Sequence, residues 1–205
     1  MNKYMGFYEL KGINLPTVPW QLFMPDTVLD GSLLWTVRVA VESNNDLHLP
    51  RAVGVGVEEA ARKGKELLRK YAGKGMVIYY PYFIAQKSGV LDVNSQRTVI
   101  EAVDKDLWNL VTDGRKNVTA VFPSAMANAD GAQYIGDDTF LNREEVEELL
   151  RYSATLGGRY REELSEGKSI LAEWSYAFST DIRHEPIGAR YLVFYELRGV
   201  QGYSR

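Results

Sequence analysis

Two apolar, aromatic-rich segments, residues 170–178 and 191–198, each carry a glutamate where a strand would normally place an apolar side chain. Both segments have the composition of β-strands, and the two acids are Glu173 and Glu196. A lone carboxylate is costly to bury, so each acid requires a cation, a metal ion or a hydrogen-bond donor nearby. Two acids on neighbouring strands are suited to a divalent ion and, through it, to a phosphate. An ion pair of either acid with Arg198 would satisfy the same groups without a ligand.

The alternation of side chains along a strand assigns these acids to faces. Glu173 is expected to share its face with Leu171 and Ser175, and Glu196 with Phe194 and Arg198.

The rest of the chain contains many short strand-like segments and few helices. Strands are expected at residues 4–10, 33–41, 52–57, 76–83, 88–93, 97–103 and 117–122. Helices are expected at residues 58–71 and 142–163, the second beginning with a capping sequence at Asn142, and residues 124–138 are expected to form a loop. Because the helices do not alternate regularly with the strands, the pattern favours an α+β fold over a doubly wound parallel sheet.

Composition excludes several classes of function. The chain has 205 residues and a net charge of −3, which gives no general attraction to nucleic acid or to an acidic membrane. It has no cysteine, and its two histidines, His48 and His184, lie far apart and are expected to be ordinary surface residues, so thiolate catalysis and a histidine-rich metal site are excluded. No apolar run has membrane-spanning length and no signal peptide is evident, so we expect a cytoplasmic protein.

Arg38 lies within the apolar segment 33–41, where alternation separates it from Trp35, Val37 and Val39. It is either a cation on the solvent face or a guanidinium that contacts phosphate oxygens. Glu101 lies in a similar strand and is either solvent-facing or part of a site.

Two further motifs have more than one interpretation. Gly54 and Gly56 precede a helix, but the acids that follow would repel a pyrophosphate, which favours a plain strand-to-helix turn. Residues 7–12 also nearly repeat residues 194–199, which suggests either two similar strand environments or two strands that flank one site.

Six short motifs occur along nearly the whole chain, and each contains a glycine, a charged residue or both. They are Lys11-Gly12-Ile13-Asn14-Leu15 followed by Val18-Pro19, Thr36-Val37-Arg38, Ser88-Gly89-Val90, Val99-Ile100-Glu101-Ala102, Leu171-Ala172-Glu173-Trp174 and Tyr195-Glu196-Leu197-Arg198-Gly199. Their sequence and order resemble the amino-terminal nucleotide-binding domain of pyruvate phosphate dikinase and phosphoenolpyruvate synthase, which belongs to the ATP-grasp class. The resemblance implies an ATP-grasp-like α+β fold with a mixed or antiparallel sheet, shortened relative to the family.

The resemblance also implies roles for the charged residues. Lys11, Arg38 and Arg198 would face the phosphates of ATP, with the two arginines stabilising the transferred phosphoryl group. Glu173, together with Glu196, would bind Mg²⁺, and Glu101 would be a further nucleotide-binding residue. Lys11 and Arg198 are therefore expected to approach each other.

The sequence departs from the family at four positions. Leu171 stands where the family has a metal-binding aspartate, Glu196 replaces a glutamine, and Val39 and Ala40 replace serines. The leading hypothesis is a nucleotide-binding protein that uses ATP and Mg²⁺, acting as a phosphotransferase if it is an enzyme. The alternative is a non-catalytic member of the fold that acts as a structural or protein-interaction module.

The expected organisation is an N-terminal lobe of residues 1–75 and a C-terminal sheet lobe of residues 76–205, packed as one compact unit. Besides the nucleotide, the expected partners are another protein or a second copy of the chain.

Overall fold

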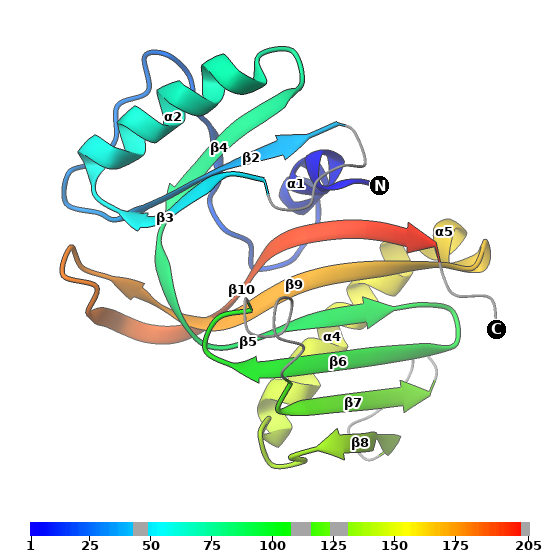
Figure 1. Ribbon diagram of the computed structural model, residues 1–205. Coiled ribbons are helices and arrows are strands. Elements are labelled where there is room, and N and C mark those ends of the chain that lie inside the picture. Colours follow the sequence, from blue (N-terminus) through cyan, green and yellow to red (C-terminus); the bar gives the residue numbers. More distant parts are fainter. Residues whose placement is uncertain (43–48, 108–115, 124–130, 202–205) are drawn as a thin grey trace.

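Two antiparallel β-sheets, stacked one above the other, form the framework of the molecule (Figure 1). The computed structural model describes residues 1–42, 49–107, 116–123 and 131–201. The α+β class expected from the sequence is confirmed. In chain order the described elements are α1 (Lys3–Gly12), β1 (Gln21–Leu22), β2 (Trp35–Val41), β3 (Arg51–Val55), α2 (Val57–Tyr71), β4 (Gly75–Pro81), β5 (Phe83–Val93), β6 (Arg97–Asp104), β7 (Val118–Pro123), β8 (Gln133–Gly136), α4 (Arg143–Arg159), α5 (Arg161–Ser165), β9 (Lys168–Thr180) and β10 (Pro186–Gln201).

The four-stranded sheet has the order β1-β4-β2-β3 and carries α2 on one face (Figure 1). Alternation along β2 decides which side chains meet this helix. Trp35, Val37 and Val39 are buried in the cluster that α2 covers, whereas Ala40 belongs to the core on the other face. Arg38 is on the same face as Ala40, so the strand presents a cation toward the second sheet.

The six-stranded sheet has the order β10-β9-β5-β6-β7-β8, with α4 lying across its far face in Figure 1. The expected start of α4 is confirmed, because Asn142 and Glu145 form a capping box. Leu149 and Leu156 of α4 join Trp174 and Leu91 of the sheet in the larger core. One face of this sheet is thereby buried under a helix and the other is turned away from it.

The backbone around the N-terminus and the Tyr82 linker connects the two sheets. Tyr82 is the single residue between β4, in the first sheet, and β5, in the second. The segment before β1 runs beside β10, where Val18 donates a backbone hydrogen bond to Phe194 and Phe194 donates one to Pro16. The helix α1 also packs on β10, so closely that a Cβ on Gly6 would lie 1.8 Å from the carbonyl oxygen of Leu197.

The structure corrects the expectation of a strand at residues 4–10, because this segment is the helix α1. Its physical basis is the Asn2 side chain, which accepts a hydrogen bond from the amide of Met5 and caps the helix, and the spacing of the buried Phe7 and Leu10 on one helical face. The near-repeat therefore does not reflect two similar strands, because residues 7–12 are helical and residues 194–199 form a strand.

A β-bulge corrects the face assigned to Phe194. The register shifts between Phe194 and Glu196, so Tyr195 is an extra residue that inverts the alternation. Phe194 contacts Tyr152 of α4, while Glu196 lies on the opposite face of the sheet with Arg198.

Two smaller results concern the loop and the helices. Residues 133–136 form β8, within the segment expected to be loop, while residues 124–130 lie outside the described residues. No helix in the described part of the chain is long and apolar enough to span a membrane.

Candidate functional site

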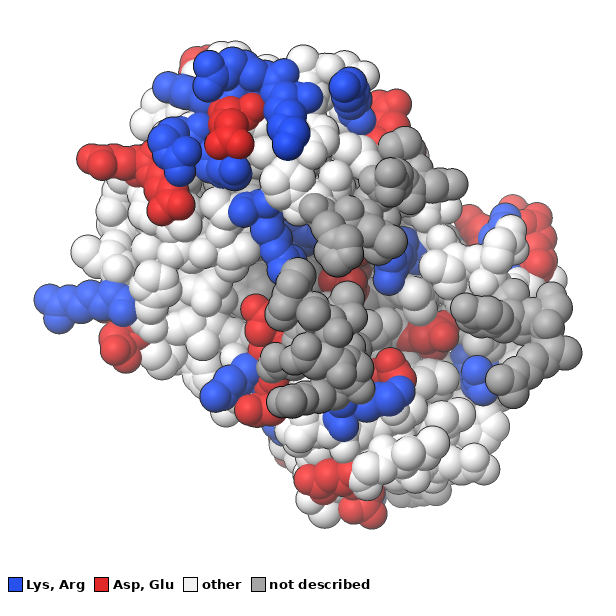
Figure 2. Space-filling model, in the orientation of Figure 1, with Lys and Arg blue, Asp and Glu red and all other residues white. Residues whose placement is uncertain are grey.

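The face of the six-stranded sheet that does not pack on α4 carries Glu101, Glu173, Glu196 and Arg198, and we refer to it as the polar face. One register row across β10, β9, β5, β6 and β7 consists of Glu196, Glu173, Val90, Glu101 and Thr119. The next row contains Arg198, Leu171, Asp92, Val99 and Val121. Acidic and basic side chains border the recess visible between the parts that hold the two sheets (Figure 2).

Arg38 joins the two sheets. Its Nη2 donates a 2.8 Å hydrogen bond to Oε2 of Glu196, a residue 158 positions away in sequence. Only 13% of the Arg38 side chain and 2% of the Glu196 side chain are exposed. Of the two readings of Arg38 from the sequence, the solvent-face cation is therefore wrong.

The surroundings of Arg38 favour its charged form. The guanidinium carbon lies 5.4 Å from the centre of the Phe7 ring, and the Tyr80 hydroxyl oxygen accepts a hydrogen bond from the guanidinium. Burial alone would lower the pKa of Arg38, but Tyr80 and the nearby carboxylates raise it above its ordinary value. The site thus holds a permanent cation between the sheets.

Glu173 and Glu196 lie directly opposite each other on β9 and β10. Side chains in such a pair are close neighbours, and two carboxylates in this arrangement repel each other unless a cation lies between them. Arg38 interacts electrostatically with both acids. The Tyr195 hydroxyl is close enough to Glu173 to feel its charge. Burial, and then the Glu173 carboxylate, raise the pKa of Tyr195 well above its ordinary value.

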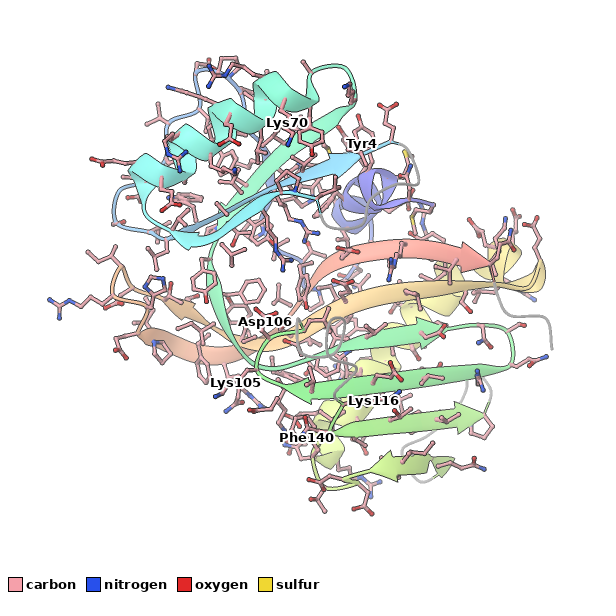
Figure 3. All side chains as sticks on the ribbon, viewed as in Figure 1. Tyr4, Lys70, Lys105, Asp106, Lys116 and Phe140 are labelled. Atoms are coloured by element: carbon pink, nitrogen blue, oxygen red, sulfur yellow. The ribbon has the colours of Figure 1, made fainter. Side chains whose placement is uncertain are left out.

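Glu101 lies in the same register row, further from Arg38. Its Oε1 forms an ion pair with the ammonium of Lys116, and 31% of its side chain is exposed. Lys116, labelled in Figure 3, projects beside β6 and β7. The structure thus places Glu101 on the polar face with a cation of its own, two strands away from Glu173.

Arg198 and Asp92 occupy the second row of the polar face. Within the described residues, Nε of Arg198 and Oδ1 of Asp92 are buried and have no hydrogen-bond partner. Burial raises the pKa of the Asp92 carboxyl, although a hydrogen bond from Ser169 opposes this effect. Among the ion pairs between described residues, Arg198 pairs with neither Glu173 nor Glu196, and Glu196 pairs with Arg38.

Lys11 lies apart from Arg198. Its ammonium is 3.9 Å from the centre of the Trp20 ring, at the C-terminal end of α1. The amide of Gly199, next to Arg198, instead bonds to the carbonyl of Met1 before the other end of the helix. Ten helical residues span about 15 Å, so these backbone positions are separated by the length of α1. The expected approach of Lys11 and Arg198 is therefore corrected.

The carboxylates of the site meet part of what a Mg²⁺ ion requires. The described residues contain no group of three or more histidine, aspartate or glutamate side chains that would hold a metal by themselves. Mg²⁺, however, is commonly held by one or two protein carboxylates together with substrate phosphates. Glu173 and Glu196 fit that second arrangement, with the condition that Glu196 is shared with Arg38.

Several site residues escaped the sequence analysis. Tyr80 and Tyr195 were not expected because tyrosines in apolar strands resemble core residues, and Asp92 resembles a strand-end polar residue. A residue-by-residue face assignment along residues 88–93 would have put Asp92 on the face of Val90. Gly54 and Gly56 form the expected strand-to-helix turn, since α2 begins with Glu58 and Glu59 in its first turn. His48 lies outside the described residues.

Comparison with known proteins gives a fold match. No protein-family model matches the sequence, and no curated protein matches it. The structure is similar to the dinucleotide forming acetyl-coenzyme A synthetase 1 of Ca. Korarchaeum cryptofilum in complex with coenzyme A and Ca-AMPCP, with a TM-score of 0.56 and 9% identity over 98% of this chain and 93% of that chain. The D-cycloserine synthetase DcsG gives a TM-score of 0.45 and 10% identity over 95% of this chain and 61% of that chain. The first match confirms the ATP-grasp-like fold.

Proposed function

We propose that this chain is an ATP-grasp-like nucleotide-binding protein, in which the phosphates of ATP lie between Arg38 of the four-stranded sheet and the polar face of the six-stranded sheet. The observation that carries the proposal is the buried contact between Arg38 and Glu196. It brings a cation from one sheet and two opposed carboxylates from the other to one place.

The residues have separate roles in this proposal. Arg38 and Arg198 bind phosphate oxygens, as guanidinium groups do through paired N–H donors. Nε of Arg198 supports this role, because it is a buried donor without a partner in the described residues. Glu173, with Glu196, holds Mg²⁺, which when bound supplies neutralising charge on the phosphates. Glu101 and Lys11 already have other partners, the Lys116 ammonium and the Trp20 ring respectively, and take a secondary role in this proposal.

The finer proposal is an ATP-dependent phosphotransferase that resembles the nucleotide domain of pyruvate phosphate dikinase. Phosphoryl transfer depends mainly on cations that stabilise developing charge and on the positioning of the phosphates, both of which a buried Arg38 would provide. The similar synthetase was solved with Ca-AMPCP, a nucleotide analogue with a metal ion, which supports the same class of ligand here.

Calorimetric titration of the protein with ATP and Mg²⁺ tests nucleotide binding. We expect saturable heat for the parent chain and at least a tenfold weaker affinity in Glu173→Gln when Mg²⁺ is present. The matched control is Glu147→Gln on the exposed side of α4, where the carboxylate pairs with Arg143. Absence of heat at millimolar ATP, with no difference between the two variants, would contradict the proposal.

A second candidate function rests on the same ion pair. Arg38 and Glu196 already neutralise each other inside the protein, and the position of a family metal ligand is held by Leu171. A non-catalytic module that binds a partner protein or a second copy of the chain requires neither a free cation for phosphate nor a complete metal site. Sedimentation of the protein at submicromolar concentration, with and without ATP, separates the two: a nucleotide-independent dimer together with no calorimetric signal favours the module.

A further inference from the structure

The β9–β10 hairpin forms an arm whose tip meets the other sheet beside the junction of the two sheets. Nε2 of His184, at the tip, lies 2.8 Å from the carbonyl oxygen of Gly54 at the end of β3. The His184 ring also contacts the ring of Tyr82, with centroids 5.9 Å apart. Tyr82 is the residue that links the two sheets, so one side chain touches both the four-stranded sheet and the linker.

The tip is built to hold His184 in place. The Asp181 carboxylate accepts hydrogen bonds from the amides of Arg183 and Glu185, and the Asp181 carbonyl accepts one from the amide of His184. His184 itself has a φ of +64°, in the left-handed region that is uncommon for a residue with a side chain. A defined turn therefore aims the imidazole at Gly54.

The base of the arm is anchored as well. Arg190 donates hydrogen bonds to Glu145 of α4 and to Gln86 of β5, and Lys87 donates to the other oxygen of Glu145. Glu145 is 2% exposed, so the junction is centred on a buried carboxylate. An arm fixed at its base transmits any movement of its tip to the sheet that carries the polar face.

We propose that His184 is a positioning residue that latches the two sheets at the separation at which Arg38 meets Glu196. The latch acts through the hydrogen bond to Gly54 and the contact with Tyr82. When it is broken, the sheets part more often at the Tyr82 linker. The effect on ligand entry rests on the proposed nucleotide-binding function, whereas the effect on sheet separation does not.

Amide hydrogen exchange of the ligand-free protein tests the latch. The amide of Tyr82 donates to the carbonyl of Leu34 at 2.8 Å and reports opening at the linker. A lost neutral hydrogen bond changes an equilibrium by about fivefold, so His184→Ala should exchange at residue 82 about five times faster than the parent. Gly54→Ala should do the same, because its Cβ would lie 3.3 Å from Nε2 of His184 at a φ of +66°.

Two variants separate positioning from loss of structure. Arg183→Ala changes the exposed residue next to His184. Arg183 bonds to the Asp181 carboxylate through its backbone amide, which the substitution keeps, so the amide of residue 82 should exchange as in the parent. His184→Gln retains a side-chain N–H donor and should recover part of the protection. Exchange within β4 at residues 77–79 should be unchanged in every variant, because the four-stranded sheet itself stays folded.

Ligand entry gives the second measurement, by stopped-flow mixing with MgATP. We expect faster association and faster dissociation in His184→Ala. If the parent binds no MgATP, the proposed function fails while the exchange experiment still decides the latch. Equal exchange at residue 82 in parent and His184→Ala, an equal rise in Arg183→Ala, or no recovery in His184→Gln would each overturn the latch.

Discussion

Replacing Arg38 by methionine should destabilise the protein strongly, because it leaves the Glu196 carboxylate buried without its cation. The pair is 13% and 2% exposed, and removing one partner of such a pair typically costs about 3–5 kcal/mol. Glu173, directly opposite Glu196, increases the effect, since two facing carboxylates then lack the charge between them. Arg38→Met should therefore cost more than Glu196→Gln.

Thermal and urea unfolding measure this effect. For a protein of this size a loss of about 3–5 kcal/mol lowers Tm by roughly 6–20 °C. The double variant Arg38→Met/Glu196→Leu removes both charges and should return to within about 2 kcal/mol of the parent. Arg62→Met is the control, because its ion pairs with Glu59 and Glu66 are exposed and are expected to contribute little to stability.

The result that would refute the reasoning is a small effect. If Arg38→Met lowers the free energy of unfolding by less than about 1 kcal/mol and shows no coupling to Glu196→Leu, the two side chains do not form a buried pair in solution. If the free energy of unfolding of Arg38→Met instead rises toward that of the parent at acidic pH, where the facing carboxylates become protonated, the result supports the buried pair.

The remaining predictions concern pH and packing. Despite burial, the Lys87 ammonium and other donors lower the pKa of Glu145. The ionised Glu145 carboxylate therefore stabilises the protein at pH values above the ordinary carboxyl pKa, and this stabilisation is lost as the pH falls through the lowered pKa. In urea titrations at several pH values, Glu145→Gln should reduce this loss of stability at acidic pH. Burial raises the pKa of Asp92, so the protein should lose stability as pH rises through that value, and Asp92→Asn should remove this loss. Gly157→Ala, in an open position of α4, should stabilise by about 0.5–1 kcal/mol, whereas Gly6→Ala should prevent α1 from docking, both read from Tm.

The sequence predicted the elements whose periodicity is local. Alternation along residues 35–41 separated Arg38 from the apolar positions, and the capping sequence at Asn142 fixed the start of α4. The fold class followed from the order of these elements. Helix α1 was missed because aromatic residues favour strands by composition, while the deciding features are the Asn2 cap and the packing of Gly6 on β10.

The candidate site was only partly predictable for a different reason. The types of side chain were evident, but the pairing of Arg38 with Glu196 joins residues 158 positions apart and depends on how the sheets stack. The face of Glu196 depends on the bulge at Tyr195, which no periodic pattern encodes. Lys11 was assigned to the site by motif, yet the helix that carries it directs its ammonium to Trp20.

The docking of α1 on β10 has a consequence for how the protein is made. A helix of ten residues is marginal by itself in water, and the buried side of α1 is completed by the Leu197 backbone. On the ribosome, α1 emerges long before β10 has been translated, so it should remain an unstructured nascent segment until then. Emergence of β10, rather than emergence of α1 itself, would set the time at which this helix forms.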